Sequence, residues 1–77
     1  EALGLAEEAV ALAERNPTAP GYTLAGYRLG LGDLLRGDGQ TERAAGQYQR
    51  VLDDPASARW DRFVALVGLA WCALARG

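Results

Sequence analysis

Few residues of this 77-residue chain could carry out acid–base, nucleophilic or metal chemistry, and none of them is a histidine. Histidine is the commonest metal ligand and the usual general base, so its absence removes a conventional catalytic triad. The one cysteine, Cys72, lies between Trp71 and Ala73 in the most apolar part of the chain. Because apolar surroundings disfavour the reactive thiolate, we predict a packed and unreactive thiol.

The other acid–base candidates are two pairs of adjacent carboxylates, Glu7-Glu8 and Asp53-Asp54. Adjacent residues of a helix point about 100° apart, so the first pair is not expected to act on one substrate. The second pair precedes Pro55, where capping of a helix end explains it. Gly37-Asp38-Gly39 lacks the alternating oxygen ligands of a calcium loop. We therefore predict neither a catalytic site nor a metal site.

Gly30-Leu31-Gly32 has the spacing that begins a phosphate-binding glycine loop. A dinucleotide fingerprint also needs a preceding strand and a third glycine three residues on, where this chain has Leu35. The glycines fall inside a helical pattern, so we assign them to close helix packing. In particular, we expect Gly32 to lie where a partner helix approaches closely at Ala44. No cofactor is predicted.

Composition excludes several classes of partner. The net charge is −2, and the eight arginines are spread along the chain and form no basic stripe, so no nucleic acid is expected. The longest uncharged run, residues 63–75, is too short for the roughly 20 residues that cross a bilayer. One cysteine forms no internal disulfide, which favours a reducing, cytoplasmic setting.

Three breaks, at residues 17–21, 37–39 and 53–55, divide the chain into segments with helical spacing of apolar residues. No segment shows the sustained alternation typical of strands. Short connections imply that successive helices are antiparallel. We predict one all-α domain over residues 1–77, with helices over about 2–15, 19–36, 40–53 and 58–76.

The last helix is apolar nearly all round, so it must be covered on both sides. One apolar stripe comprises Trp60, Val64, Val67, Trp71 and Leu74. A second stripe has no following helix in this chain, and we expect the sequence to be a piece of a longer repeat array. We therefore predict that the chain self-associates into a homo-oligomer through the residues of this second stripe: Leu66, Leu69 and Ala73.

The chain repeats itself at two nearly equal offsets. An offset of 38 aligns Ala6, Val10, Ala13 and Pro17 with Ala44, Tyr48, Val51 and Pro55. An offset of 36 aligns Leu31-Gly32 and Leu35 with Val67-Gly68 and Trp71. The central run resembles the tetratricopeptide repeat signature, and consists of Leu31, Gly32, Leu35, Gly39, Ala44, Tyr48, Val51 and Pro55.

This resemblance implies a right-handed superhelical stack of antiparallel helix-turn-helix pairs, here one central repeat with a half-repeat on each side. It also implies a protein–protein interaction scaffold whose concave face binds a peptide or helix of a partner. By position in the family, the partner-binding candidates are Leu29, Asp33, Arg36, Arg62 and Leu69, beside Ala65 and Cys72. Arg36 and Arg62 are the expected anchors for acidic groups, unless both are simply solvated.

Two alternatives stay open from the sequence. The chain could be a regulatory or sensor segment of a bacterial transcriptional or ATPase-type signalling protein, since many of these carry such repeats. A small helical-bundle enzyme with acid–base carboxylates is the second alternative, although we expect no enzyme. A pocket in which two carboxylates with shifted pKa values converge would favour the enzyme.

Overall fold

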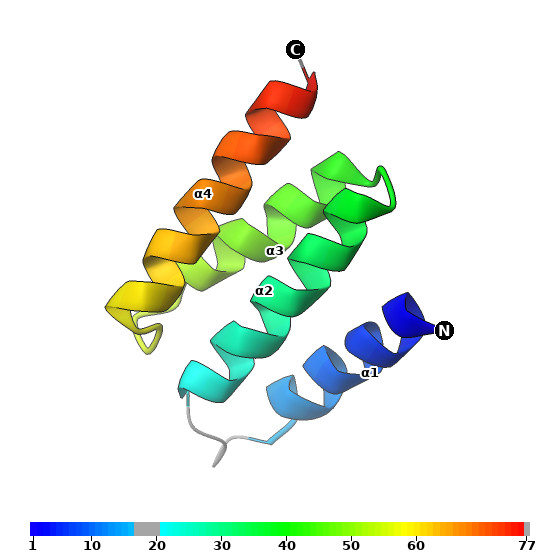
Figure 1. Ribbon diagram of the computed structural model, residues 1–77. Coiled ribbons are helices and arrows are strands. Elements are labelled where there is room, and N and C mark those ends of the chain that lie inside the picture. Colours follow the sequence, from blue (N-terminus) through cyan, green and yellow to red (C-terminus); the bar gives the residue numbers. More distant parts are fainter. Residues whose placement is uncertain (17–20, 77) are drawn as a thin grey trace.

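The computed structural model describes residues 1–16 and 21–76, which form four α-helices and no strand. The helices are α1 (Ala2–Glu14), α2 (Gly21–Gly37), α3 (Thr41–Asp53) and α4 (Arg59–Arg76), and each runs antiparallel to the one before it (Figure 1). The all-α prediction is confirmed. The observed ends differ by one residue at most from the expected ones, except that the expected start of α2 at residue 19 lies outside the described residues.

The connections between α2, α3 and α4 are short turns with local hydrogen bonds. Gly39 adopts a positive φ of 81°, which glycine tolerates without steric cost. This conformation lets Gln40 N donate to Leu35 O (2.9 Å) and closes the end of α2. After α3, Asp54 Oδ1 accepts a hydrogen bond from Ala56 N (2.9 Å), which forms a turn in the loop. Because α4 begins only at Arg59, this carboxylate does not cap the start of a helix as predicted.

Helix α2 lies at the centre of the arrangement. Its backbone packs against α1, α3 and α4, whereas α4 packs against α3 and α2. Among the described residues, the backbone of α1 approaches only α2. Helices α2 and α4 run in the same direction side by side, with α3 crossing behind them (Figure 1). The molecule is therefore flat, with Cα extents of 39 × 29 × 14 Å.

Tyr48 of α3 forms the centre of the core and is fully buried. Its ring lies between the two mid-helix glycines, Gly32 of α2 and Gly68 of α4. A Cβ on Gly32 would come within 2.8 Å of Tyr48 Cε1, and a Cβ on Gly68 within 2.6 Å of three ring carbons. Both glycines therefore serve close packing, as predicted, but the group nearest to Gly32 is the Tyr48 ring and not Ala44.

The outer helices bury mainly small residues. Helix α1 buries Val10, whereas Leu5 and Leu12 on another face are 66% and 54% exposed. The prediction that α4 is covered on both sides does not hold within the described residues, because its larger apolar stripe is mostly exposed. Helix α4 buries Ala65, Gly68 and Cys72, since the Tyr48 ring requires a close approach of α4 to α3. The buried position of Cys72 agrees with the prediction of a packed thiol.

Candidate functional site

The most prominent surface feature is a row of large apolar side chains along α4, which we call the α4 stripe. Its residues recur at intervals of three or four positions, so they share one face of the helix, opposite the buried one. The stripe consists of Trp60 (70% exposed), Phe63 (54%), Val67 (41%), Trp71 (53%) and Leu74 (71%). At its beginning, the rings of Trp60 and Phe63 lie 5.3 Å apart and form a small apolar depression with Arg59. Contiguous apolar surface of this kind is typical of an interaction site.

The internal repeat explains why the stripe is uncovered. Leu31 and Leu35 of α2 are 3% and 0% exposed, whereas their counterparts Val67 and Trp71 of α4 are 41% and 53% exposed. Helix α2 has one helix packed before it in the chain, α1, and another after it, α3. Helix α4 has only α3 and α2 as neighbours within the described residues. The part of the α4 stripe at Val67 and Trp71 therefore corresponds to a face that α2 buries, whereas Tyr27, the counterpart of Phe63, is itself 45% exposed.

A polar cluster borders the stripe where α2 and α4 lie side by side. The guanidinium carbon of Arg36 lies 5.9 Å from the centre of the Trp71 ring, within range of a cation–π interaction. Arg36 Nε donates to the Tyr48 hydroxyl (3.3 Å), which in turn donates to Asp33 Oδ1 (2.5 Å). Arg36 also lies 3.7 Å from Asp33 Oδ1.

This cluster shifts two pKa values. Burial, together with the hydrogen bond to Asp33, raises the pKa of Tyr48 from 10.0 to about 12. The hydrogen bond with the Tyr48 hydroxyl raises the pKa of Arg36 further above its ordinary value. At neutral pH the hydroxyl is therefore a donor fixed to Asp33. The cluster presents one cation, one carboxylate and the face of Trp71, which suits recognition of a polar peptide edge.

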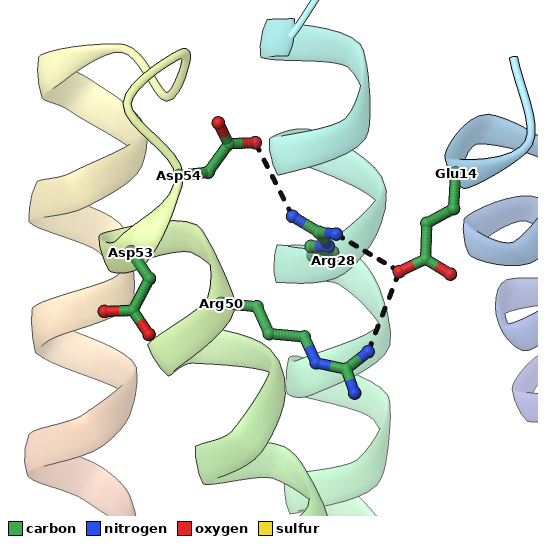
Figure 2. Close-up of a pocket in the computed structure, with 5 residues that line it drawn as sticks. All are labelled: Glu14, Arg28, Arg50, Asp53 and Asp54. Atoms are coloured by element: carbon green, nitrogen blue, oxygen red, sulfur yellow. Dashed lines mark hydrogen bonds and ion pairs between the residues drawn. The ribbon is translucent and has the colours of Figure 1, made fainter. Parts of the chain in front are cut away.

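A second, polar depression lies between α1, α2 and the end of α3 (Figure 2). Arg28 is its centre, with a side chain only 13% exposed. One of its terminal nitrogens is 3.1 Å from Glu14 and the other is 3.6 Å from Asp54. Arg50 adds a longer contact of 3.7 Å to Glu14, and Asp53 completes the lining.

The chemistry of this depression is structural. Arg28 and Arg50 each face at least one carboxylate, so both positive charges are neutralised locally. Among the described atoms that line this depression, Arg28 Nε is the one buried polar side-chain atom without a hydrogen-bond partner. The network ties α1 to α2 and to the loop after α3. Removing one partner of a partly buried ion pair is costly, because the remaining charge is left without compensation away from water. We therefore assign this depression to helix packing.

The five partner-binding candidates from the sequence do not share one surface. Asp33 and Arg36 do lie together and remain accessible, with side chains 53% and 35% exposed. Leu29 is only 8% exposed and belongs to the core. Leu69 is half-buried against the core. Of this set, Asp33 and Arg36 alone border the α4 stripe.

Arg62 has a different role from the expected anchor for acidic groups, and it is not simply solvated. Its terminal nitrogens donate to Leu52 O (3.0 Å) and Asp54 O (3.1 Å), and its Nε donates to Ser57 O (3.4 Å). These carbonyls lie at the end of α3 and in the following loop. Arg62 therefore closes the α3–α4 connection and has little capacity left for a ligand.

The remaining residues that the sequence placed at the groove or at the self-association surface are likewise buried in some cases and exposed in others. Ala65 and Cys72, expected beside the groove, are fully buried and cannot line it. Among the self-association candidates, Leu66 is 56% exposed and Ala73 is exposed. The sequence interpretation missed that Trp71, with Phe63 and Trp60, is the larger exposed surface. The signal was present in the match of Trp71 to Leu35, which is 0% exposed, whereas no helix among the described residues covers Trp71.

Within the two described ranges, no three histidine, cysteine or acidic side chains gather as a metal site would require. In the same ranges, no helix combines the length and hydropathy needed to cross a membrane. Comparisons with protein families, curated proteins and solved structures found no match to this chain. The class is therefore defined by the architecture of the described residues alone, which form a small all-α arrangement of four helices with an uncovered apolar helix face.

Proposed function

We propose that this chain is a protein-binding module with a tetratricopeptide-like stack of helices, and that it holds a peptide or helix of a partner protein. The binding surface is the α4 stripe together with Arg36 and Asp33 at its edge. This is the interaction role expected from the sequence. The main contacts, however, are now assigned to the α4 stripe and not to the residues expected on the concave face.

The observation that carries the proposal is the exposure of five large apolar residues on one helix face, two of them tryptophans. Tryptophan and arginine are the residues most enriched at the energetic centres of interfaces. Trp71 beside Arg36 supplies both, at a contact distance of 5.9 Å. Arg36 at the edge of the stripe and the exposed Arg59 at its start favour partners with acidic flanks.

The tetratricopeptide-like stack is supported by three features. The successive helices are antiparallel, α2 and α4 pack side by side, and the Tyr48 ring separates the repeated glycines, Gly32 and Gly68. In such a stack each helix pair is covered by the next one. An uncovered face at α4 is therefore a natural docking position for a helix.

The proposal is tested by selecting binders from a random peptide display library on the immobilised chain and measuring their affinity by fluorescence polarisation. We expect apolar peptides with acidic flanks. Trp71→Ser should weaken binding by more than about tenfold, because truncation of a central tryptophan commonly costs at least 2 kcal/mol. Gln49→Ala, at an exposed position on α3, is the matched control and should leave the affinity unchanged. Peptides that bind wild type, Trp71→Ser and Phe63→Ser equally would refute the proposed surface.

A further inference from the structure

We infer that the occupant of the α4 stripe is α1 of a second copy of this chain, so that copies stack head to tail. This inference rests on the proposed function, because it names the partner of the same surface. Three observations carry it: the equivalence of α1 and α3, the match of side chains that this equivalence produces, and the charges of the two helices.

Helices α1 and α3 are equivalent elements of the repeat. Val10 of α1 and Tyr48 of α3 occupy the same position at an offset of 38, and each is the buried centre of its helix, 5% and 0% exposed. The central helix α2 packs against both α1 and α3, whereas α4 packs against α3 alone of the two. The neighbour that α4 lacks among the described residues is therefore a helix of the α1 type. In its own chain the backbone of α1 approaches only α2 among the described residues, so another face of α1 is available.

The side chains that link α1 to α3 within one chain define the register. Glu7 pairs with Arg43 and Glu14 with Arg50, each at 3.7 Å. In the stack, the next contact of this kind joins α3 of one copy to α1 of the next copy. Each residue of the original contact is then replaced by its counterpart 38 positions away.

In the shifted contact, every charged residue is replaced by an apolar one. Ala45 and Leu52 of one copy stand where Glu7 and Glu14 stand, and Leu5 and Leu12 of the next copy stand where Arg43 and Arg50 stand. Leu5 and Leu12 are 66% and 54% exposed in the single chain, and Ala45 and Leu52 are only partly buried. Two ion pairs thus become two apolar pairs with the same geometry. A random surface would mix charged and apolar positions.

The charges of the two surfaces are also complementary. Among the described residues, Glu8 of α1 and Arg59 of α4 are exposed and make no ion pair within the chain, whereas the other charged side chains named above are already engaged within it. The same charges disfavour pairing of α4 with α4. A contact between two different surfaces does not close on itself unless the rotation returns to the start, so head-to-tail stacking forms open chains of copies.

Two variants block one surface each. The double variant Leu5→Glu/Leu12→Glu blocks α1, and the single variant Val67→Glu blocks the α4 stripe. Both variants introduce negative charge, so the blocked α1 of one cannot pair with the blocked α4 stripe of the other. All three positions are at least 41% exposed, and circular dichroism checks that the helices persist. If Val67→Glu loses helical signal, Leu74→Glu, at a position 71% exposed, replaces it.

The measurement is molar mass by light scattering or sedimentation, in a concentration series that reaches about 1 mM because one helix face is smaller than a standard interface of about 800 Å² per partner. The wild-type mass should rise past that of a dimer. Each blocked variant should remain a monomer, and an equimolar mixture of the two should stop at the heterodimer. A wild type that remains monomeric at every concentration overturns the inference, as does an α1-blocked variant that still forms dimers through α4.

The outcome also separates this inference from the proposed function. A monomeric wild type that selects peptides, and loses them in Trp71→Ser, refutes stacking and leaves the proposed function standing. A chain that neither associates nor selects peptides refutes both.

Discussion

Replacement of Gly68 by alanine should test the central packing contact of this fold. The added Cβ would lie 2.6 Å from Tyr48 Cε1 and Cε2, closer than van der Waals contact permits. The ring cannot move away freely, because it is fully buried, faces Gly32 on α2 and is fixed through its hydroxyl to Asp33 and Arg36. We therefore expect α4 to be displaced from α3.

The magnitude follows from two opposing effects. Overpacking a core costs about 1–3 kcal/mol, and the fixed ring places Gly68→Ala near the upper end. Alanine in mid-helix gains about 1 kcal/mol over glycine. The net loss in free energy of unfolding should be about 2 kcal/mol. For a domain of this size that corresponds to a fall in Tm of roughly 8–16 °C.

The assay is urea and thermal denaturation followed by far-UV circular dichroism, with Gly30→Ala as the matched control. A Cβ on Gly30 meets no atom within 4 Å, so this variant keeps only the helical gain and should be more stable than wild type by about 1 kcal/mol. In a Tyr48→Leu background, Gly68→Ala should lose most of its cost. A Gly68→Ala variant as stable as Gly30→Ala would show that the ring does not separate the two helices.

Four further outcomes are expected. Tyr48→Phe removes the hydroxyl that donates to Asp33 and should lower the free energy of unfolding by about 1 kcal/mol in urea denaturation. The raised pKa of Tyr48, about 12 against 10.0, means that the fold favours the neutral phenol. Its contribution to stability is thus complete below pH 10 and is lost as the pH rises towards about 12; an alkaline titration should show this loss in wild type and not in Tyr48→Phe. Arg62→Gln, which removes hydrogen bonds to carbonyls at the end of α3, should cost about 1–2 kcal/mol, whereas Arg59→Gln at an exposed neighbouring position should be neutral. Glu14→Gln should lower stability by roughly 0.5–1 kcal/mol at low salt and by less at high salt, measured by urea denaturation in each buffer.

The helices and their order could be predicted from local signals. Gly39 supplies the backbone freedom that ends α2, and Asp54 forms the turn after α3. These effects act within a few residues, so they can be predicted without knowledge of tertiary contacts. The spacing of Gly32 and Gly68 likewise indicated close packing, since a mid-helix glycine needs compensation from a neighbour.

The candidate site was less accessible to such reasoning. Arg62 and Arg36 look alike in the sequence, yet one bonds the carbonyls at the end of α3 and the other lies over the Trp71 ring. Asp33 and Leu69 occupy matching positions at the offset of 36, but one is exposed and the other half-buried. Which neighbour a long side chain meets depends on how adjacent helices are placed, and local sequence does not encode that placement.

The sequence by itself determined the all-α class, the four helices, the turns between them and the repeated small positions, because each follows from local backbone preference and apolar periodicity. Only the tertiary structure decided that Tyr48 fills the space between Gly32 and Gly68, and that α4 therefore turns its small residues inward and its tryptophans outward. The physical reason is that a helix with apolar residues on nearly every side has several faces it could bury. The bulk of one ring on the neighbouring helix selects among them.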